Sequence, residues 1–340
     1  MTENIFIIAS GTGGHVIPAR NISNMLIKKK YNVIWIGTST GIENRLVNNK
    51  NIIIKHINSS GVRGKNIINI IKGIFNMFTS FLHSLILIYK NKPLLVLGFG
   101  GYITVPVSMA AFVMRVPVYV HESNSIPGTA NKINHLFSKI TFQTFPGTFS
   151  KHKKIILSGN PINDSFSHIT KPEIKYSKSK SKLNILIFGG SQGARFFNNT
   201  IPHCLSKFKS NFNIKHISGT GNKEVVERIY KNKDLVSEVI DFSNDMNSLY
   251  DWSDIVISRA GSMTVSEISK SGRASILVPF TYATDNHQYS NAKYLENHKA
   301  CIIIEENQYF SENLDKFLLN LYHEQKQLLS LSTNCKYLFP

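Results

Sequence analysis

Short apolar runs that each end in a glycine-containing turn recur along this chain and predict buried parallel strands. Residues 5–9 pass directly into the turn 11–14, and a helix is predicted to start at Pro18. Residues 94–97 and 185–188 likewise run into glycine clusters. Because strands and helices alternate in this way, we expect parallel sheets that are covered by helices on both faces.

The alternation occurs twice, before and after a stretch rich in lysine and serine from Ser165 to Lys182, which is predicted to be a linker. A chain of 340 residues is long enough for two hydrophobic cores. We therefore predict an α/β protein with two doubly wound, Rossmann-like domains, residues 1–162 and 163–340, facing each other across a cleft. In such sheets the turns after the strands gather at the carboxyl edge and line a ligand site.

The first glycine turn has the chemistry of an anion site. Its glycines let the backbone approach a ligand, and the N-terminus of the following helix favours negative charge. A dinucleotide site would need a third glycine where Val16 stands, and an acidic residue at the end of the next strand, where none precedes Glu43. NAD binding is therefore not expected. His15 at this turn is either a structural capping residue or a catalytic base.

The segment 67–89 is the most apolar part of the chain. Its polar positions form one narrow stripe on a helix, which comprises Asn69, Lys72, Asn76, Thr79 and His83. This stripe, and the intact α/β pattern on both sides, argue against a membrane-spanning helix. Two interpretations remain: one or two helices packed in the core, or a surface that dips into a membrane interface.

The chain has a formal net charge of +18, which attracts phosphate groups of nucleic acids or anionic lipids. The lysines are scattered, and no predicted helix has a basic face interleaved with aromatic residues, so nucleic acid is not an expected partner. Solvated charge and attraction to an anionic membrane surface remain. Cys204, Cys301 and Cys335 lie far apart, which predicts free thiols in a reducing compartment and no metal site. No signal peptide is recognisable, so a cytoplasmic location is expected.

Seven motifs follow one another over almost the whole chain. They are GTGGH (11–15), GGY (100–102), HESN (121–124), GNP (159–161), GGSQGAR (189–195), TVSE (264–267) and QYSNA (288–292). Together they resemble the bacterial peptidoglycan N-acetylglucosaminyltransferases of glycosyltransferase family 28. The resemblance implies a GT-B fold and an inverting hexosyltransferase that uses UDP-N-acetylglucosamine. It further implies lipid I as the acceptor, lipid II as the product, a peripheral location on the cytoplasmic face of the inner membrane, and no cofactor or metal.

The resemblance also implies roles for residues of the first domain, which would bind the acceptor and face the membrane. Thr12, Gly13 and Gly14 would form a substrate-binding loop. His15 would be the base that takes the proton from the acceptor hydroxyl, and the helix N-terminus favours the neutral imidazole that a base requires. Asn124 would be a donor-site residue.

The second domain would bind the donor. Ser191 would bind the donor phosphates at a helix start, and Gln288 would read sugar hydroxyls. The Glu267 carboxylate would accept hydrogen bonds from the ribose hydroxyls, unless it is only a solvated helix carboxylate. The residues implied to line the nucleotide are Ser262, Met263, Thr264, Val265, Ser266 and Glu267.

Three features depart from the family pattern. Asn163 replaces an arginine that usually follows the GNP motif, and Ser243 replaces an apolar residue at a uracil contact. The chain also ends at Pro340, soon after a predicted helix over 311–331, whereas GT-B folds usually end with a helix that returns to the first domain. Weaker coupling between the domains is therefore expected.

Two other classes of function remain as alternatives. The chain could be a nucleotide-sugar or lipid-phosphate binding protein that keeps the fold without turnover, or a membrane-anchored scaffold. The transferase interpretation requires His15 together with the donor-site residues, and a scaffold does not.

Overall fold

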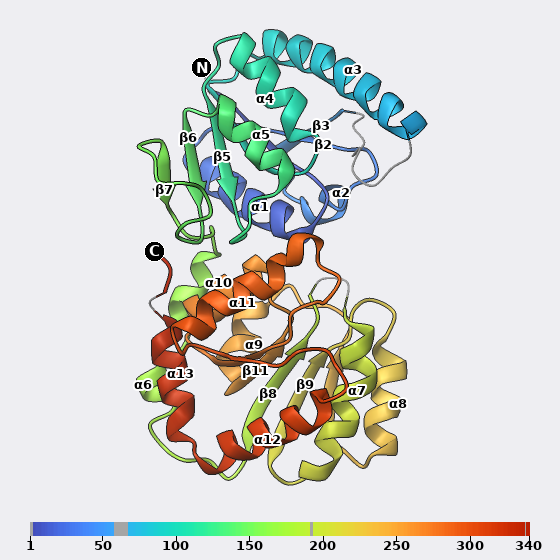
Figure 1. Ribbon diagram of the computed structural model, residues 1–340, viewed down its shortest axis with the longest axis vertical. Helices are drawn as coiled ribbons and strands as arrows, with labels where there is room; N and C mark the ends of the chain where they lie inside the picture. The colour runs from blue at the N-terminus through green and yellow to red at the C-terminus, as the bar shows by residue number, and fades with distance from the viewer. Residues whose placement is uncertain (1–2, 58–66, 191–192, 337) are drawn as a thin grey trace. The chain divides into compact units, whose positions relative to one another are not determined.

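The computed structural model describes residues 3–57, 67–190, 193–336 and 338–340, and the chain divides into two compact units, Met1–Pro161 and Ile162–Pro340 (Figure 1). Each unit contains a parallel sheet with helices on both faces. The predicted α/β class with two doubly wound domains is therefore confirmed.

In the described part of the first unit, seven strands form one parallel sheet in the order β3-β2-β1-β4-β5-β6-β7. The strands are β1 (Asn4–Ala9), β2 (Asn32–Gly37), β3 (Ile52–His56), β4 (Leu95–Gly100), β5 (Val118–Glu122), β6 (Ile140–Gln143) and β7 (Ile155–Leu157). The helices are α1 (Gly13–Lys28), α2 (Glu43–Leu46), α3 (Ile67–Asn91), α4 (Thr104–Val113) and α5 (Thr129–Phe137). The strand order reverses between β1 and β4, so the glycine turns after these two strands are neighbours at the carboxyl edge.

The apolar sequence of β1 reflects burial on both faces of the sheet. Phe6 and Ile8 belong to a core cluster with residues of α3 and α4, whereas Ile5 and Ile7 belong to a cluster with residues of α1. Figure 1 shows α3 and α4 on one face of the sheet and α1 on the other. A central parallel strand has no solvated side, and its sequence therefore lacks the apolar-polar alternation of a half-exposed strand.

The described part of the second unit has a six-stranded parallel sheet in the order β10-β9-β8-β11-β12-β13, which reverses between β8 and β11. The strands are β8 (Leu183–Phe188), β9 (Phe212–Ile217), β10 (Ser237–Ile240), β11 (Ile255–Ser258), β12 (Ala274–Leu277) and β13 (Ile302–Ile303). The α-helices are α6 (Pro172–Lys175), α7 (Arg195–Leu205), α8 (Lys223–Asn232), α9 (Met246–Trp252), α10 (Ser262–Ser271), α11 (His287–Asn297), α12 (Phe310–His323) and α13 (Lys326–Lys336). The 3₁₀ helices are η1 (Asp164–His168), η2 (Ser206–Phe208) and η3 (Thr284–Asn286).

The stretch predicted as a linker, Ser165 to Lys182, is folded onto the second unit, so that prediction was wrong. The Tyr176 hydroxyl donates to the Asp254 carbonyl at 2.7 Å, and Lys180 Nζ lies 2.5 Å from the buried Asp254 carboxylate. A buried carboxylate needs such partners. A segment rich in lysine and serine is typical of a solvated linker. Composition alone does not show that one of its lysines pairs with a buried acid.

The predicted helix over 311–331 is two helices, α12 and α13, with a break at Glu324 and Gln325. Gln325 Oε1 accepts the Lys180 N–H, and Gln325 Nε2 donates to the Lys180 carbonyl, both at 2.8 Å. This pair of hydrogen bonds to a distant segment lies at the break. Helical periodicity in the sequence does not reveal such a contact.

His216 on β9 gives a testable dependence of stability on pH. It is buried, its Nδ1 lies 3.0 Å from the Tyr230 hydroxyl, and burial lowers the pKa of His216 from 6.5 to about 3. As pH falls below about 6.5, the unfolded chain binds a proton that the folded unit does not, so stability falls by up to about 1.4 kcal/mol per pH unit. Urea denaturation between pH 7 and 5.5 should show a smaller loss for His216→Asn than for wild type. Equal losses would contradict this.

Candidate functional site

The first glycine turn places His15 in the first turn of α1. The helix begins at Gly13 and not at Pro18 as predicted, and Pro18 lies inside it. Proline has no N–H to give to the carbonyl four residues earlier, which is that of Gly14. The Ser123 hydroxyl, from the segment after β5, donates to this carbonyl at 3.1 Å. This hydrogen bond connects the start of α1 to the segment that follows β5.

The His15 ring has a defined orientation. Nδ1 lies 3.2 Å from the Ser10 carbonyl oxygen, which can only accept, so Nδ1 carries the hydrogen and Nε2 is the acceptor of the neutral ring. The ring lies against Gly100 in the second glycine turn. A Cβ at Gly100 would come within 2.7 Å of His15 Cδ2 and Nε2, and the φ of Gly100 is +125°. The two glycine turns of this unit therefore meet at His15.

The buried His121, on β5, makes a hydrogen bond near the same edge of the sheet. Its Nε2 donates to the Gly159 carbonyl at 3.1 Å, and burial lowers the pKa of His121. Asn21 on α1 donates to the Pro161 carbonyl at 2.8 Å. The GNP motif is thus hydrogen-bonded to β5 through His121 and to α1 through Asn21. These two side chains therefore have a structural role.

Glu122 organises the loop that carries Asn124. Its carboxylate is buried and accepts the Asn124 N–H at 2.9 Å, the Gly128 N–H at 3.0 Å and the Asn131 side-chain amide at 2.9 Å. These donors are neutral, and together they satisfy both carboxylate oxygens. The predicted donor-site residue Asn124 therefore belongs to the first unit, on a loop built around a buried acid.

In the second unit, the glycine turn after β8 is tightly packed. A Cβ at Gly193 would lie 2.3 Å from the Ser218 carbonyl oxygen, and the φ of Gly193 is +74°. Asn198 on α7 donates to the same carbonyl at 3.0 Å. This turn leads into the N-terminus of α7. Ser191, the predicted phosphate-binding residue, lies outside the described residues, and its role stays a prediction.

The run predicted to line the nucleotide, residues 262–267, opens α10, which follows β11 at the switch point. The side chains of Ser262, Met263, Val265 and Ser266 are buried, whereas those of Thr264 and Glu267 are partly exposed. The Val265 N–H donates to the Gly261 carbonyl at 3.0 Å. The Val265 side chain is 0 % exposed, which makes it the least accessible of the four buried members of this run.

Glu267 has a neighbour that the sequence did not indicate. The Tyr250 hydroxyl, on α9, donates to Glu267 Oε2 at 3.2 Å. Burial, and the nearby Glu267 charge, raise the pKa of Tyr250 well above its usual value, so the phenol keeps its proton. The two residues are seventeen positions apart on different helices. No motif or periodicity links them, and only the fold brings them together.

Two departures from the family pattern have local structural roles. Asn163 is exposed, and its Oδ1 accepts the Ser165 N–H at 3.1 Å, which caps η1. The Ser243 hydroxyl accepts the Asp245 N–H at 3.1 Å in the loop before α9. Short polar side chains are suited to such turns. Gln288 is also engaged, because its Oε1 accepts the Phe280 N–H at 3.0 Å.

The first unit also has an exposed apolar surface on α3. One side of this helix packs into the core, with Ile88 buried and Phe81 and Leu85 partly buried. The other side leaves Phe75 65 % and Phe78 57 % exposed. Further exposed apolar residues of α3 are Ile74, Leu82, Ile86 and Tyr89. The core interpretation is therefore confirmed for one face of a single helix, and the membrane interpretation of the other face stays a prediction.

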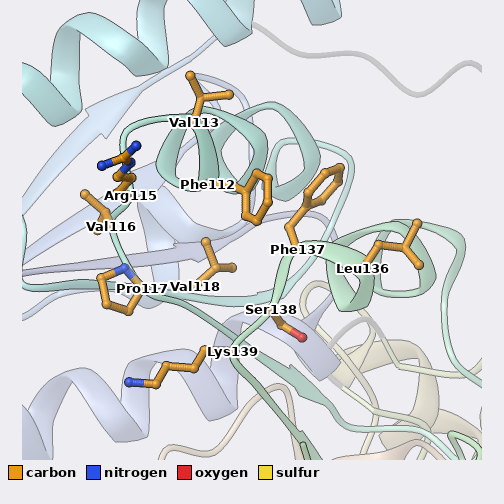
Figure 2. Close-up of a pocket in the computed structure, with 10 residues that line it drawn as sticks. All are labelled: Phe112, Val113, Arg115, Val116, Pro117, Val118, Leu136, Phe137, Ser138 and Lys139. Atoms are coloured by element: carbon orange, nitrogen blue, oxygen red, sulfur yellow. The ribbon is translucent and has the colours of Figure 1, made fainter.

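An open groove of about 590 Å³ lies at the C-terminal ends of α4 and α5. Figure 2 shows its apolar lining, which includes Phe112 and Phe137 with ring centroids 5.4 Å apart, together with Leu136. Arg115 and Lys139 also line it. Within the described ranges, every helix is too short or too polar to span a bilayer.

Two doubly wound units, with glycine turns at each switch point, define a protein of the GT-B class. Residues 5–143 match the glycosyltransferase family 28 N-terminal domain, and residues 184–337 match the glycosyltransferase family 28 C-terminal domain. The chain belongs to glycosyltransferase family 28. The resemblance drawn from the seven motifs is thus confirmed.

Individual relatives extend over nearly the full chain. The UDP-N-acetylglucosamine–N-acetylmuramyl-(pentapeptide) pyrophosphoryl-undecaprenol N-acetylglucosamine transferase of Haemophilus ducreyi is 37 % identical over 336 residues, 98 % of this chain and 93 % of the relative. The protein of the same name from Vesicomyosocius okutanii is 39 % identical over 98 % of this chain and 92 % of its own length. The crystal structure of Acinetobacter baumannii MurG superposes with a TM-score of 0.85 at 31 % identity, covering 98 % of this chain and 94 % of that one.

The Glu122 carboxylate should be required for the stability of the first unit. Glu122→Gln places an NH₂ group against N–H donors, and we expect a loss of about 1 to 3 kcal/mol in its free energy of unfolding. Chemical denaturation in a Trp252→Phe background would let Trp35 report on this unit. Glu43→Gln is the matched control: Glu43 is also buried, but its Oε2 has no hydrogen-bond partner among the described residues. Equal losses in the two variants would argue against a special role for Glu122.

Proposed function

We propose that this chain transfers N-acetylglucosamine from UDP-N-acetylglucosamine to the C4 hydroxyl of the N-acetylmuramoyl-pentapeptide of undecaprenyl-diphosphate-linked lipid I. The product is lipid II, formed with inversion at the sugar carbon. The observation that carries the proposal is the orientation of His15 between two glycine turns, within a chain whose relatives have this transferase name. A binding protein without turnover would not need a histidine with this acceptor nitrogen.

The first unit would supply the base. With Nδ1 donating to Ser10, Nε2 can accept the proton from the acceptor hydroxyl as its oxygen attacks C1 of the donor sugar. The bond from C1 to the phosphate oxygen breaks, and UDP leaves with the electron pair. The loop of Thr12, Gly13 and Gly14 would let the acceptor approach the backbone next to this histidine, because glycine has no side chain to block it.

The second unit would hold UDP at the carboxyl edge of its sheet. The N-termini of α7 and α10 both follow strands at the switch point, and their N–H groups favour the negative charge that grows on the leaving diphosphate. Glu267 would accept from the ribose hydroxyls. The Nε2 of Gln288 is the end of that amide suited to donating to sugar hydroxyls, since Oε1 accepts from Phe280. Asn163 carries no charge and would not replace the usual arginine contact.

The chain would work at the cytoplasmic face of the inner membrane, and nucleic acid would not be a partner. Its acceptor carries a polyprenyl chain and a diphosphate, so the enzyme has to reach a lipid surface. The exposed apolar side of α3, and the groove at the ends of α4 and α5 with Arg115 and Lys139, have the chemistry of a peripheral membrane surface.

A sugar-incorporation assay tests the reaction and the base together. With labelled UDP-N-acetylglucosamine and a lipid I analogue, wild type should form labelled lipid product. His15→Ala should lower turnover by roughly 10² to 10⁴, the usual contribution of a general base, with donor affinity little changed. His203→Ala, an exposed histidine on α7, is the control and should keep turnover. Lack of incorporation by wild type would refute the transferase proposal, and near-normal turnover in His15→Ala would remove His15 from the mechanism.

Vesicle sedimentation tests the membrane surface. Wild type should sediment with anionic vesicles, and salt should release it only partly, because apolar burial is less sensitive to screening than charge attraction. Replacing Phe75 and Phe78 with serine should lower vesicle binding more than UDP binding. Val225→Ser with Val236→Ser removes two exposed apolar side chains from the second unit and serves as the matched control. Normal vesicle binding by the phenylalanine variant would place the docking surface elsewhere.

A further inference from the structure

We propose that Tyr250 is a positioning residue for the donor site, whose hydroxyl holds the Glu267 carboxylate in the orientation that recognises ribose. Tyr250 would thereby strengthen the preference for a ribonucleotide over a nucleotide that lacks the ribose hydroxyls. This inference rests on the proposed function, because it assumes that Glu267 contacts the ribose of UDP.

The first step of the argument is that Tyr250 is fixed. It is 0 % exposed, and its ring contacts Phe166, at a centroid distance of 5.5 Å, and Phe188, at 6.0 Å in an edge-on arrangement. Its carbonyl accepts from Arg273 Nε at 2.8 Å and from the Ser253 hydroxyl at 2.9 Å. Both the backbone and the ring are therefore held by the core, and the hydroxyl has little freedom to follow a moving partner.

The second step is that Arg273, which holds the Tyr250 backbone, also connects the two helices that carry Tyr250 and Glu267. Arg273 is fully buried, and besides Tyr250 it contacts the Asp251 carboxylate at 2.9 Å and the Ser271 carbonyl at 3.0 Å. Asp251 lies on α9, and Ser271 is the last residue of α10. The same arginine thus ties the helix that carries Tyr250 to the helix that carries Glu267.

The third step concerns the carboxylate itself. A glutamate side chain has three rotatable bonds, and a ligand contact that has to order them loses affinity. The Tyr250 hydroxyl donates to Oε2, and a hydrogen bond to a charged acceptor is among the stronger ones in proteins. A carboxylate held through one oxygen presents the other in a defined direction. Preorganisation of this kind affects the groups that Glu267 binds and leaves the rest of the nucleotide unaffected.

The test compares the affinities of UDP and 2′,3′-dideoxy-UDP by calorimetry. Wild type should bind UDP more tightly. In Tyr250→Phe, UDP affinity should fall about 3- to 10-fold while dideoxy-UDP affinity changes little, so the ratio of the two affinities falls by the same factor. Glu267→Gln should lower this ratio too, and adding Tyr250→Phe to that variant should have little further effect, because the two residues act through one contact.

Tyr230→Phe is the matched control. Tyr230 is a buried tyrosine of the same unit whose hydroxyl contacts His216, and its variant should lose stability without changing the ratio. If Tyr250→Phe does not fold, Phe166→Leu loosens the seat of the ring while keeping the hydroxyl, and the ratio should then fall in part. An unchanged ratio in the variant tested, or equal weakening of both nucleotides, would overturn the inference alone. Failure of wild type to bind UDP would overturn the proposed function as well.

Discussion

The first-unit site depends on the contact between the His15 ring and the backbone of Gly100. The strand order reverses between β1 and β4, which makes the turns after these strands neighbours, and the imidazole fills the space where a side chain at position 100 would stand. The Ser10 carbonyl then fixes the tautomer. The glycine at the end of β4 thus determines the orientation of a histidine in the first turn of α1, and the acceptor nitrogen follows from that orientation.

In each unit, a carboxylate among the candidate residues or next to them is held by neutral donors. Glu122 accepts only from neutral donors among the described residues and orders the loop of Asn124, and Tyr250 donates to Glu267 in the second unit. A charge that is satisfied by neutral donors needs each of them at a fixed place, because every unpaired oxygen is costly to bury. The Glu122 hydrogen bonds tie the loop after β5 and the start of α5 at three points, although loops at such an edge are usually the mobile part of a fold.

Local patterns in the sequence predicted the strands, the two doubly wound units and the positions of the glycine turns, because burial on both faces leaves a continuous apolar run. Contacts between distant segments were not predictable in this way. The start of α1 was placed at Pro18, since a proline usually opens a helix. The true start at Gly13 requires Ser123 to satisfy the carbonyl that Pro18 leaves unpaired. The hydrogen bond from Tyr250 to Glu267 and the attachment of the supposed linker to Asp254 are likewise contacts between distant segments.

The exposed apolar side of α3 and the net charge of +18 are best understood together. An exposed apolar surface favours association between copies of a protein. A high net charge of one sign opposes that association, because like-charged copies repel one another. In the proposed membrane-peripheral function, the same charge would attract an anionic lipid surface, where the apolar side chains of α3 would be buried. The charge would then act selectively, because it would disfavour burial of this surface against another copy and favour its burial against lipid.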